Sequence, residues 1–283
     1  MSETMDWDLV RSVSRSFYLS LKFLPNEVRD TVALTYLLAR ASDTLADIPA
    51  ASVNFRLKAL QEYTQGRWEE VWESEFNGAK LKAGERLLLA SIPILLERIQ
   101  NHPDGDIIRE TLDEIISGQI LDIERFSLEG RKALSPEELE DYTYRVAGCV
   151  GRFWTRICFR KISNVARLSE AAMIKLGIEY GKGLQLVNIL RDRNEDVSQG
   201  REYFAQDSFE KVMARAQEAL SAGKEYGSAL RGVRIRFCSL LPYELGIRTL
   251  KLLPAQGRER VRLPRSCVYL TMFRCLVSAI AGR

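Results

Sequence analysis

Apolar residues recur at helical spacing along nearly the whole chain, and this pattern constrains the fold more than any other feature of the sequence. Nine stretches show it, at 26–47, 53–75, 83–100, 105–128, 136–161, 167–197, 208–222, 225–253 and 265–281. No run of alternating β-branched residues stands out, and no Asn-Gly or Asp-Gly dipeptide joins two such runs as a hairpin. The pattern predicts an all-α fold, and the lack of low-complexity linkers predicts a single domain over residues 1–283.

Proline and glycine refine this prediction. Ser135 and Pro136, followed by two glutamates, are typical of an N-cap and the first turn of a helix. Pro242 lies inside the stretch 225–253, where its missing N–H predicts a kink or a break. Gly148 and Gly151 lie three residues apart, and we expect them to allow close packing between helices rather than to take part in chemistry.

Composition excludes several classes of protein. The net charge is only +3 with mixed signs, so no nucleic-acid-binding surface is expected. Five cysteines without C-x-x-C spacing and a single histidine predict reduced, mostly buried thiols and no zinc site. The N-terminal residues lack an apolar signal region, which predicts a cytoplasmic protein. The apolar segment 267–281 is short and contains Arg274, so we expect a packing helix, or at most one with a peripheral membrane contact.

Two helical stripes carry paired acids. Tyr36, Arg40, Asp43 and Asp47 follow one another at helical spacing and share one face of the stretch 26–47. A second stripe in the stretch 167–197 carries four polar residues, with Arg191 at its side: Gln185, Asn188, Asp192 and Asp196.

Acids four residues apart repel each other by about 0.2–0.5 kcal/mol in an isolated helix, and burial adds to that cost. A solvated helix face is the alternative explanation for one such pair. Two pairs, each within apolar sequence and each beside its own arginine, favour a cation between the carboxylates. Mg²⁺ fits, because it is commonly held by one or two carboxylates together with substrate phosphates.

At these residues the sequence resembles the squalene/phytoene synthase family of head-to-head prenyl transferases. The resemblance runs from about Ser14 to Leu270 and rests on motifs in order: Ser14–Phe17, Tyr36–Asp47, Tyr142–Gly151, Leu186–Asp196 and Gly200–Phe204. It implies an isoprenoid-synthase helical bundle in which two Asp-rich helices face a central cavity.

The resemblance also implies a Mg²⁺-dependent reaction of two farnesyl diphosphate molecules. The first step gives a cyclopropylcarbinyl diphosphate, presqualene diphosphate, and the second gives squalene by reduction with NADPH. Apolar walls would exclude water that captures the cation.

Roles carry over from the family position by position. The metal-binding residues are expected to be Asp43, Asp47, Asp192 and Asp196. The residues expected to be catalytic are Tyr142, Asp43, Asp192 and Arg191. Those expected to bind substrate are Ser14, Arg15, Phe17, Tyr36, Arg40, Gln185 and Asn188. Those expected to contact the cofactor are Arg15, Arg40, Arg191, Arg262 and Arg265.

The product is less constrained than the chemistry. The segments Arg236–Pro242 and Arg262–Arg265 are similar to a squalene-synthase pattern and favour squalene, although a solvated basic loop explains the second equally well. Phytoene, dehydrosqualene and presqualene diphosphate synthases remain alternatives, and Ile116–Asp122 is closer to the phytoene type. Ala46 stands where many squalene synthases carry glutamate, so it is assigned no ligand. Ser42 before Asp43 argues against chain-elongating prenyl transferases, and paired acids and arginines argue against a purely structural helical protein. Chain length (C15 or C20) and oligomeric state stay open.

Overall fold

The computed structural model describes residues 5–14, 17–48, 51–68, 80–127, 133–253 and 263–281, except the side chains of Phe17 and Leu19. Within these ranges every regular element is helical, and the only strand-like feature is an isolated antiparallel bridge between Ala166 and Leu230. The all-α prediction is confirmed. The chain forms two compact units, Met1–Ser127 and Leu128–Arg283. The prediction of a single domain stays a prediction.

Helix α3 forms the centre of the first unit. It packs against each of the other helices described in that unit: α1 (Trp7–Ser14), α2 (Phe17–Phe23), α4 (Val53–Thr64), α6 (Ala83–Ala90), α7 (Ile92–Gln100) and α8 (Gly105–Phe126). α3 itself spans Asn26–Ala46, and its apolar side, including Leu37, Leu38 and Leu45, is fully buried. This packing holds the polar side of the same helix in a defined orientation.

The boundaries in this unit follow the sequence in part. The stretches 26–47 and 105–128 are confirmed as α3 and α8. The stretch 83–100 is two helices, because Pro93 lacks an N–H and is tolerated only in the first turn of α7. The stretch 53–75 was predicted too long, since α4 ends at Thr64 before Gly66 at φ 69°; residues 69–75 lie outside the described ranges. Helices α1 and α2 were not predicted.

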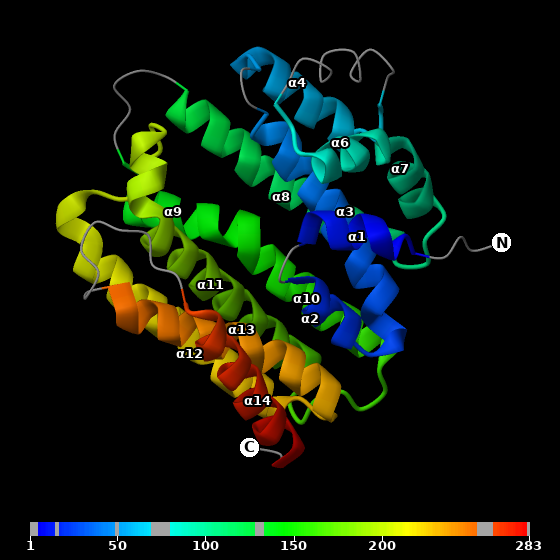
Figure 1. Ribbon diagram of the computed structural model, residues 1–283, viewed down its shortest axis with the longest axis vertical. Helices are drawn as coiled ribbons and strands as arrows, with labels where there is room; N and C mark the ends of the chain where they lie inside the picture. The colour runs from blue at the N-terminus through cyan, green and yellow to red at the C-terminus, as the bar shows by residue number, and fades with distance from the viewer. Residues whose placement is uncertain are drawn as a thin grey trace. The chain divides into compact units, whose positions relative to one another are not determined.

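The second unit is a series of helices in which each packs on the next (Figure 1). α9 (Pro136–Thr143) runs through a π-helical turn, Tyr144–Gly148, into α10 (Cys149–Lys161). α10 packs on α11 (Glu170–Ser198), α11 on α12 (Phe209–Ala229), α12 on α13 (Val233–Leu252), and α13 on α14 (Arg265–Ala281). A 3-10 turn at Gln206–Ser208 precedes α12. The stretches 136–161, 167–197 and 265–281 are thus helical as predicted, the first with a π-helical turn.

Glycines bring α10 and α11 into backbone contact. A Cβ atom on Gly151 would lie 1.9 Å from the carbonyl oxygen of Gly177, and one on Gly181 would lie 2.3 Å from that of Ala147. Gly148 faces softer neighbours, the Tyr144 ring and the Lys182 stem. The expected packing role of the Gly148–Gly151 motif is therefore confirmed.

One predicted break lies elsewhere in the chain, and another is absent. The gap expected between 222 and 225 is helical. Gly223 makes room there for the Tyr180 ring, since a Cβ at this position would lie 2.5 Å from the ring. The chain turns instead at Gly232, whose φ of 88° suits glycine. Pro242 does not split α13, which continues to Leu252. The buried Tyr180 hydroxyl donates to the Ser239 carbonyl beside the proline, at 2.8 Å.

All five cysteines are free thiols, as predicted. Cys149, Cys158 and Cys275 are buried and the other two are partly so. Burial raises the pKa of the Cys275 thiol to about 11. The single histidine, His102, is partly buried, and its Nδ1 accepts a hydrogen bond from the Asp104 N–H at 3.0 Å.

Candidate active site

The first acidic stripe lies at the C-terminal end of α3. Arg40 pairs with the Asp43 carboxylate one turn further along the helix. Asp43 is about half exposed, with 46% of its side chain accessible, and Asp47 is exposed at the C-cap, just past the last helical residue. The stripe therefore offers two solvent-accessible carboxylates beside one guanidinium.

Glu85 fixes the position of Arg40. Its carboxylate accepts a hydrogen bond from the Arg40 guanidinium at 3.2 Å and another from the Lys82 backbone N–H at 3.0 Å, at the start of α6. Burial raises the pKa of this carboxyl, but the Lys82 and Arg40 contacts outweigh that effect and hold the pKa below its usual value. Arg40 thus bridges two acids, one of them held on a neighbouring helix.

The other residues predicted in this unit lie around the junction of α1 and α3. The Tyr36 hydroxyl donates to the Val13 carbonyl at 3.3 Å and so ties α3 to the end of α1. Ser14 is buried, and its hydroxyl donates to the Val10 carbonyl of its own helix. Arg15 lies outside the described residues, as does the side chain of Phe17 at the start of α2.

The second acidic stripe lies in the last turns of α11. The Arg191 guanidinium donates two hydrogen bonds to the neighbouring Asp192 carboxylate, one of them from Nε at 2.9 Å. Both side chains are mostly buried, and 19% of the Asp192 side chain is exposed. The hydrogen bonds to Asp192 raise the pKa of Arg191 above its ordinary value. Such fork-like, charge-assisted pairs are among the stronger polar contacts in proteins.

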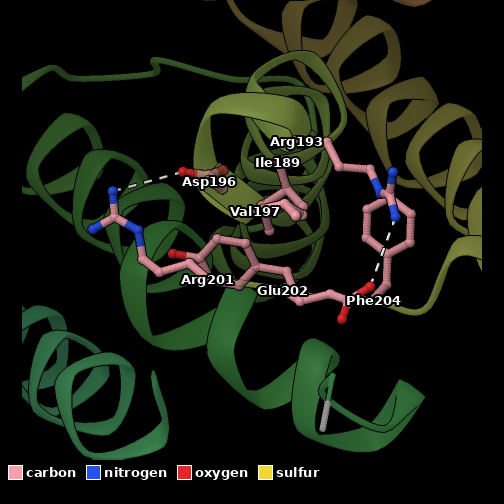
Figure 2. Close-up of a pocket in the computed structure, with 8 residues that line it drawn as sticks. Ile189, Arg193, Asp196, Val197, Arg201, Glu202 and Phe204 are labelled. Atoms are coloured by element: carbon pink, nitrogen blue, oxygen red, sulfur yellow. Dashed lines mark ion pairs between the residues drawn. The ribbon is translucent and has the colours of Figure 1, made fainter. Parts of the chain in front are cut away.

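A glycine turn brings a further arginine to Asp196. Gly200 has a φ of 81°, and the Gly200 and Arg201 N–H groups donate to the Val197 and Asp196 carbonyls at 3.0 and 2.8 Å. This is a Schellman end to α11. It places the Arg201 guanidinium 3.7 Å from the Asp196 carboxylate, as Figure 2 shows. Asp196 therefore carries its own counter-ion, as Asp43 and Asp192 do.

A small hollow lies beside this turn. Arg193 also lines it, and Figure 2 shows its ion pair with Glu202. The Arg193 guanidinium lies 3.8 Å from the Glu202 carboxylate and 5.2 Å from the centre of the Phe204 ring. The remaining lining of the hollow comes from Ile189, Asp196, Val197, Arg201 and Tyr203. The two ion pairs and the contact of Arg193 with the Phe204 ring keep the segment 200–204 against α11.

Tyr142 forms a pair with a second tyrosine. Both rings are buried and stacked, with centroids 5.1 Å apart, and the Tyr142 hydroxyl donates to the Tyr203 hydroxyl at 3.3 Å. Tyr142 comes from α9 and Tyr203 from the segment that follows the Schellman turn. A hydroxyl held in this way has a defined direction for exchanging a proton or facing a cation.

The remaining predicted residues are placed as follows. On α11, Gln185 is partly buried two turns before Asp192, and Asn188 is exposed one turn before it. Arg265 is the exposed first residue of α14, and Arg262 lies outside the described residues. The roles assigned to all these residues stay predictions.

The donors fit magnesium only in partnership with a substrate. Among the described residues, no three acidic, histidine or cysteine side chains gather into a metal-binding group. Each stripe offers two carboxylates, Asp43 with Asp47 and Asp192 with Asp196. Mg²⁺ is commonly held by one or two carboxylates, with phosphate oxygens and water completing its shell. The residues present therefore suit a metal that arrives with a diphosphate.

Sequence reasoning missed three partners of the predicted residues. Glu85, Arg201 and Tyr203 contact Arg40, Asp196 and Tyr142 respectively. The Gly200–Phe204 run drew attention to two of them. Nothing in the local pattern around Glu85 pointed to a residue 45 positions away.

The architecture is that of known head-to-head synthases. The solved complex of TcSQS with the ligand E5700 superposes with a TM-score of 0.78, covering 98% of this chain and 89% of that chain at 21% identity. At that identity the likeness shows the all-α fold alone.

Sequence comparison narrows the class. The family model described as squalene/phytoene synthase matches residues 10–212, so the chain belongs to the squalene/phytoene synthase family of prenyltransferases. Squalene synthase ERG9 of Saccharomyces cerevisiae is 27% identical over 77% of this chain and 49% of its own length. The bifunctional lycopene cyclase/phytoene synthase of Blakeslea trispora is 29% identical over 67% of this chain and 30% of its own length. The chain spans about half or less of these relatives.

Proposed function

We propose that the chain is a squalene synthase that joins two farnesyl diphosphate molecules head to head through presqualene diphosphate and reduces the product with NADPH. The observation that carries this proposal is the pairing of acid with arginine on both α3 and α11, Arg40 with Asp43 and Arg191 with Asp192. Similarity to squalene synthases supports the choice of product.

The two stripes suit the loss of a diphosphate leaving group. Asp43 and Asp47, and Asp192 and Asp196, would hold Mg²⁺, which when bound supplies Lewis acidity toward the diphosphate. In the free protein, Arg40 pairs with Asp43 and Arg191 with Asp192. A guanidinium binds phosphate oxygens as readily as carboxylate oxygens, so each arginine can turn to the diphosphate once the acids are engaged.

The tyrosine pair suits the steps after ionisation. An aromatic ring stabilises a cation that lies over its face, which is the role proposed for Tyr142. The Tyr142 hydroxyl, fixed by Tyr203, can hold a proton in a defined direction. Burial of both rings keeps water away from this hydroxyl pair. Water at this position would otherwise compete for the cation.

Phytoene or dehydrosqualene synthesis without NADPH is the second candidate. It is favoured by the match to the Blakeslea trispora protein and by the phytoene-type pattern in α8 that ends at Asp122. A synthase that stops at presqualene diphosphate uses the same two stripes. The proposed roles of Arg15, Arg262 and Arg265 toward NADPH distinguish the first proposal from these alternatives.

Product analysis tests the proposal. Purified protein is incubated with Mg²⁺ and farnesyl or geranylgeranyl diphosphate, with and without NADPH, and the hydrocarbon is identified by mass spectrometry. Squalene formed only with NADPH is the expected result. A C40 product, a C30 product indifferent to NADPH, or presqualene diphosphate alone would refute it.

Acid variants test the metal assignment. Asp43→Asn and Asp192→Asn should each reduce turnover by about 10³-fold, since each removes a charge that the diphosphate–metal complex needs. Asp30→Asn is the matched control, because Asp30 is an exposed acid on the same helix α3 that pairs weakly with Arg29 at 3.9 Å. Circular dichroism should be unchanged in all three. Wild-type turnover in Asp43→Asn would contradict the assignment.

A further inference from the structure

Helix α14 presents an apolar stripe to solvent. Its members are between 50% and 66% exposed, although they are large hydrophobic side chains. They occupy positions i, i+1, i+4, i+8 and i+11 along the helix, so they share one of its faces. We call them the α14 stripe: Tyr269, Leu270, Phe273, Val277 and Ile280. Contiguous exposed apolar surface of this kind marks an interaction site.

The opposite face of α14 anchors the helix to the protein. Cys275 and Ala279 are buried in a cluster with Phe237 and Leu241 of α13. The buried Arg236 donates to the Ala279 carbonyl at 2.9 Å, and so ties the end of α14 to the start of α13. The α14 stripe therefore stands on a helix that is held in place, and it is not that helix's core-facing side.

Positive charges border the stripe. Arg265 and Arg274 are exposed, and at about 100° per residue they lie just beyond its two edges. None of the 17 residues of α14 is acidic. Exposed Arg231 and Arg234 lie at the start of α13, the end that Arg236 ties to α14. Glu244 of α13 adds to the raised pKa of the Cys275 thiol on α14. The charges of Arg248 and Arg274 lower that pKa.

This charge pattern disfavours a second copy of the chain as the partner. In a two-fold interface the same patch meets itself, so the arginines at the edges of one stripe would meet those of the other, with no acid on either helix to separate them. A negatively charged lipid surface has the opposite complementarity. An apolar face with aromatic residues, bordered by arginines, is the composition of helices that lie in the headgroup region of a bilayer.

We propose that the α14 stripe inserts into the surface of an anionic lipid bilayer, with Arg265 and Arg274 contacting phosphate groups. None of the described helices is long and apolar enough to cross a membrane, so the contact is along the surface. The proposal is independent of which hydrocarbon the protein makes.

Vesicle sedimentation tests it. The full chain is mixed with phosphatidylcholine vesicles, or with vesicles containing 30% phosphatidylglycerol, and the bound fraction is measured. Binding should be at least about tenfold tighter to the anionic vesicles and should weaken as salt is raised. The double variant Tyr269→Ser/Phe273→Ser should lose at least about tenfold in affinity, because two large apolar groups no longer insert. Arg274→Gln should weaken binding to anionic vesicles alone.

Controls separate insertion from misfolding and self-association. Ile94→Ser removes a single exposed apolar side chain from α7, 55% exposed, and should bind as the wild type does. Phe273→Trp should show a blue shift in fluorescence on adding anionic vesicles. No blue shift, equal binding to both kinds of vesicle, unchanged binding of the double variant, or a dimer that the double variant abolishes would each overturn the proposal.

Discussion

Replacement of Gly151 by alanine probes the contact that positions α11, the helix that carries Asp192 and Asp196. The added Cβ would lie 1.9 Å from the Gly177 carbonyl oxygen and 2.5 Å from its carbon. Both atoms belong to the backbone of the facing helix, so no side-chain rotation relieves the clash. The two helices must move apart by about 1 Å, which leaves gaps in an interface packed like a crystal.

The magnitude follows from two opposing terms. Alanine favours a helix over glycine by about 1 kcal/mol. Overpacking in a closed interface typically costs about 1–3 kcal/mol and more where backbone must move. Because this clash is backbone against backbone, we expect the upper end to apply and a net loss of about 2–3 kcal/mol in the free energy of unfolding.

Urea unfolding followed by circular dichroism at 222 nm measures this loss. Gly148→Ala is the matched control, since Gly148 lies one turn away in the same motif but a Cβ there would have side-chain atoms as its nearest neighbours, from Tyr144 at 3.1 Å, Lys182 at 3.2 Å and Ile178 at 3.4 Å. Those side chains can shift, so its stability should stay within about 1 kcal/mol of the wild type. A Gly151→Ala protein as stable as the wild type, or equal losses for both variants, would refute the reasoning.

Three further predictions concern the charges and hydroxyls around the stripes. Glu85→Gln replaces a charge-assisted contact to Arg40 by a neutral one, so the KM for farnesyl diphosphate should rise about fivefold in steady-state assays, while Glu97→Gln on the exposed side of α7 should leave it unchanged. Tyr203→Phe removes the acceptor of the Tyr142 hydroxyl and should lower kcat about fivefold with little change in KM; an unchanged kcat would exclude a role for the pair. Arg215 donates to Glu140 and Glu179 at 2.6 and 2.7 Å. Burial raises the pKa of both carboxyls, but the contacts with Arg215 and Lys182 outweigh burial and hold each pKa below its ordinary value. A carboxyl with a depressed folded-state pKa stabilises the protein above its unfolded pKa and loses that contribution as the pH falls through the folded one. Arg215→Met should therefore destabilise the protein more at pH 7 than at acidic pH, as measured by urea unfolding over that range; an equal loss at all pH values would contradict this linkage.

Helix type and most helix positions could be predicted from the sequence, because they follow from local periodicity. In the stretches that correspond to α3, α8, α11 and α14, apolar residues recur with the 3.6-residue period of a helix, and the ends are recognisable. Helices α1 and α2 were not predicted, and the other failures occurred at prolines and glycines. Pro93 and Gly223 each have two readings, as a breaker or as a packing residue, and only the neighbouring chain selects one: Pro93 begins α7, whereas Gly223 makes room for Tyr180.

The candidate site divides in the same way. Spacing alone brought Arg40 and Asp43 onto one helical face, and the neighbours Arg191 and Asp192 were visible in the sequence before their contact was seen. Glu85 and Tyr203 could not be predicted, because they reach their partners across 45 and 61 residues of chain. Contacts at such separation depend on how helices pack, and no local pattern encodes that.

The sequence by itself determined the helical class, the two acidic stripes and the family, since each rests on residues within a few turns of one another. Tertiary structure alone decided which groups contact the residues predicted for the site: Glu85 beside Arg40, Arg201 beside Asp196 through the Gly200 turn, and Tyr203 against Tyr142. It also decided the character of α14, which its composition left between a core helix and a surface one. Side chains of similar hydrophobicity lie on both faces of that helix, and only its packing on α13 determines which of them meet solvent.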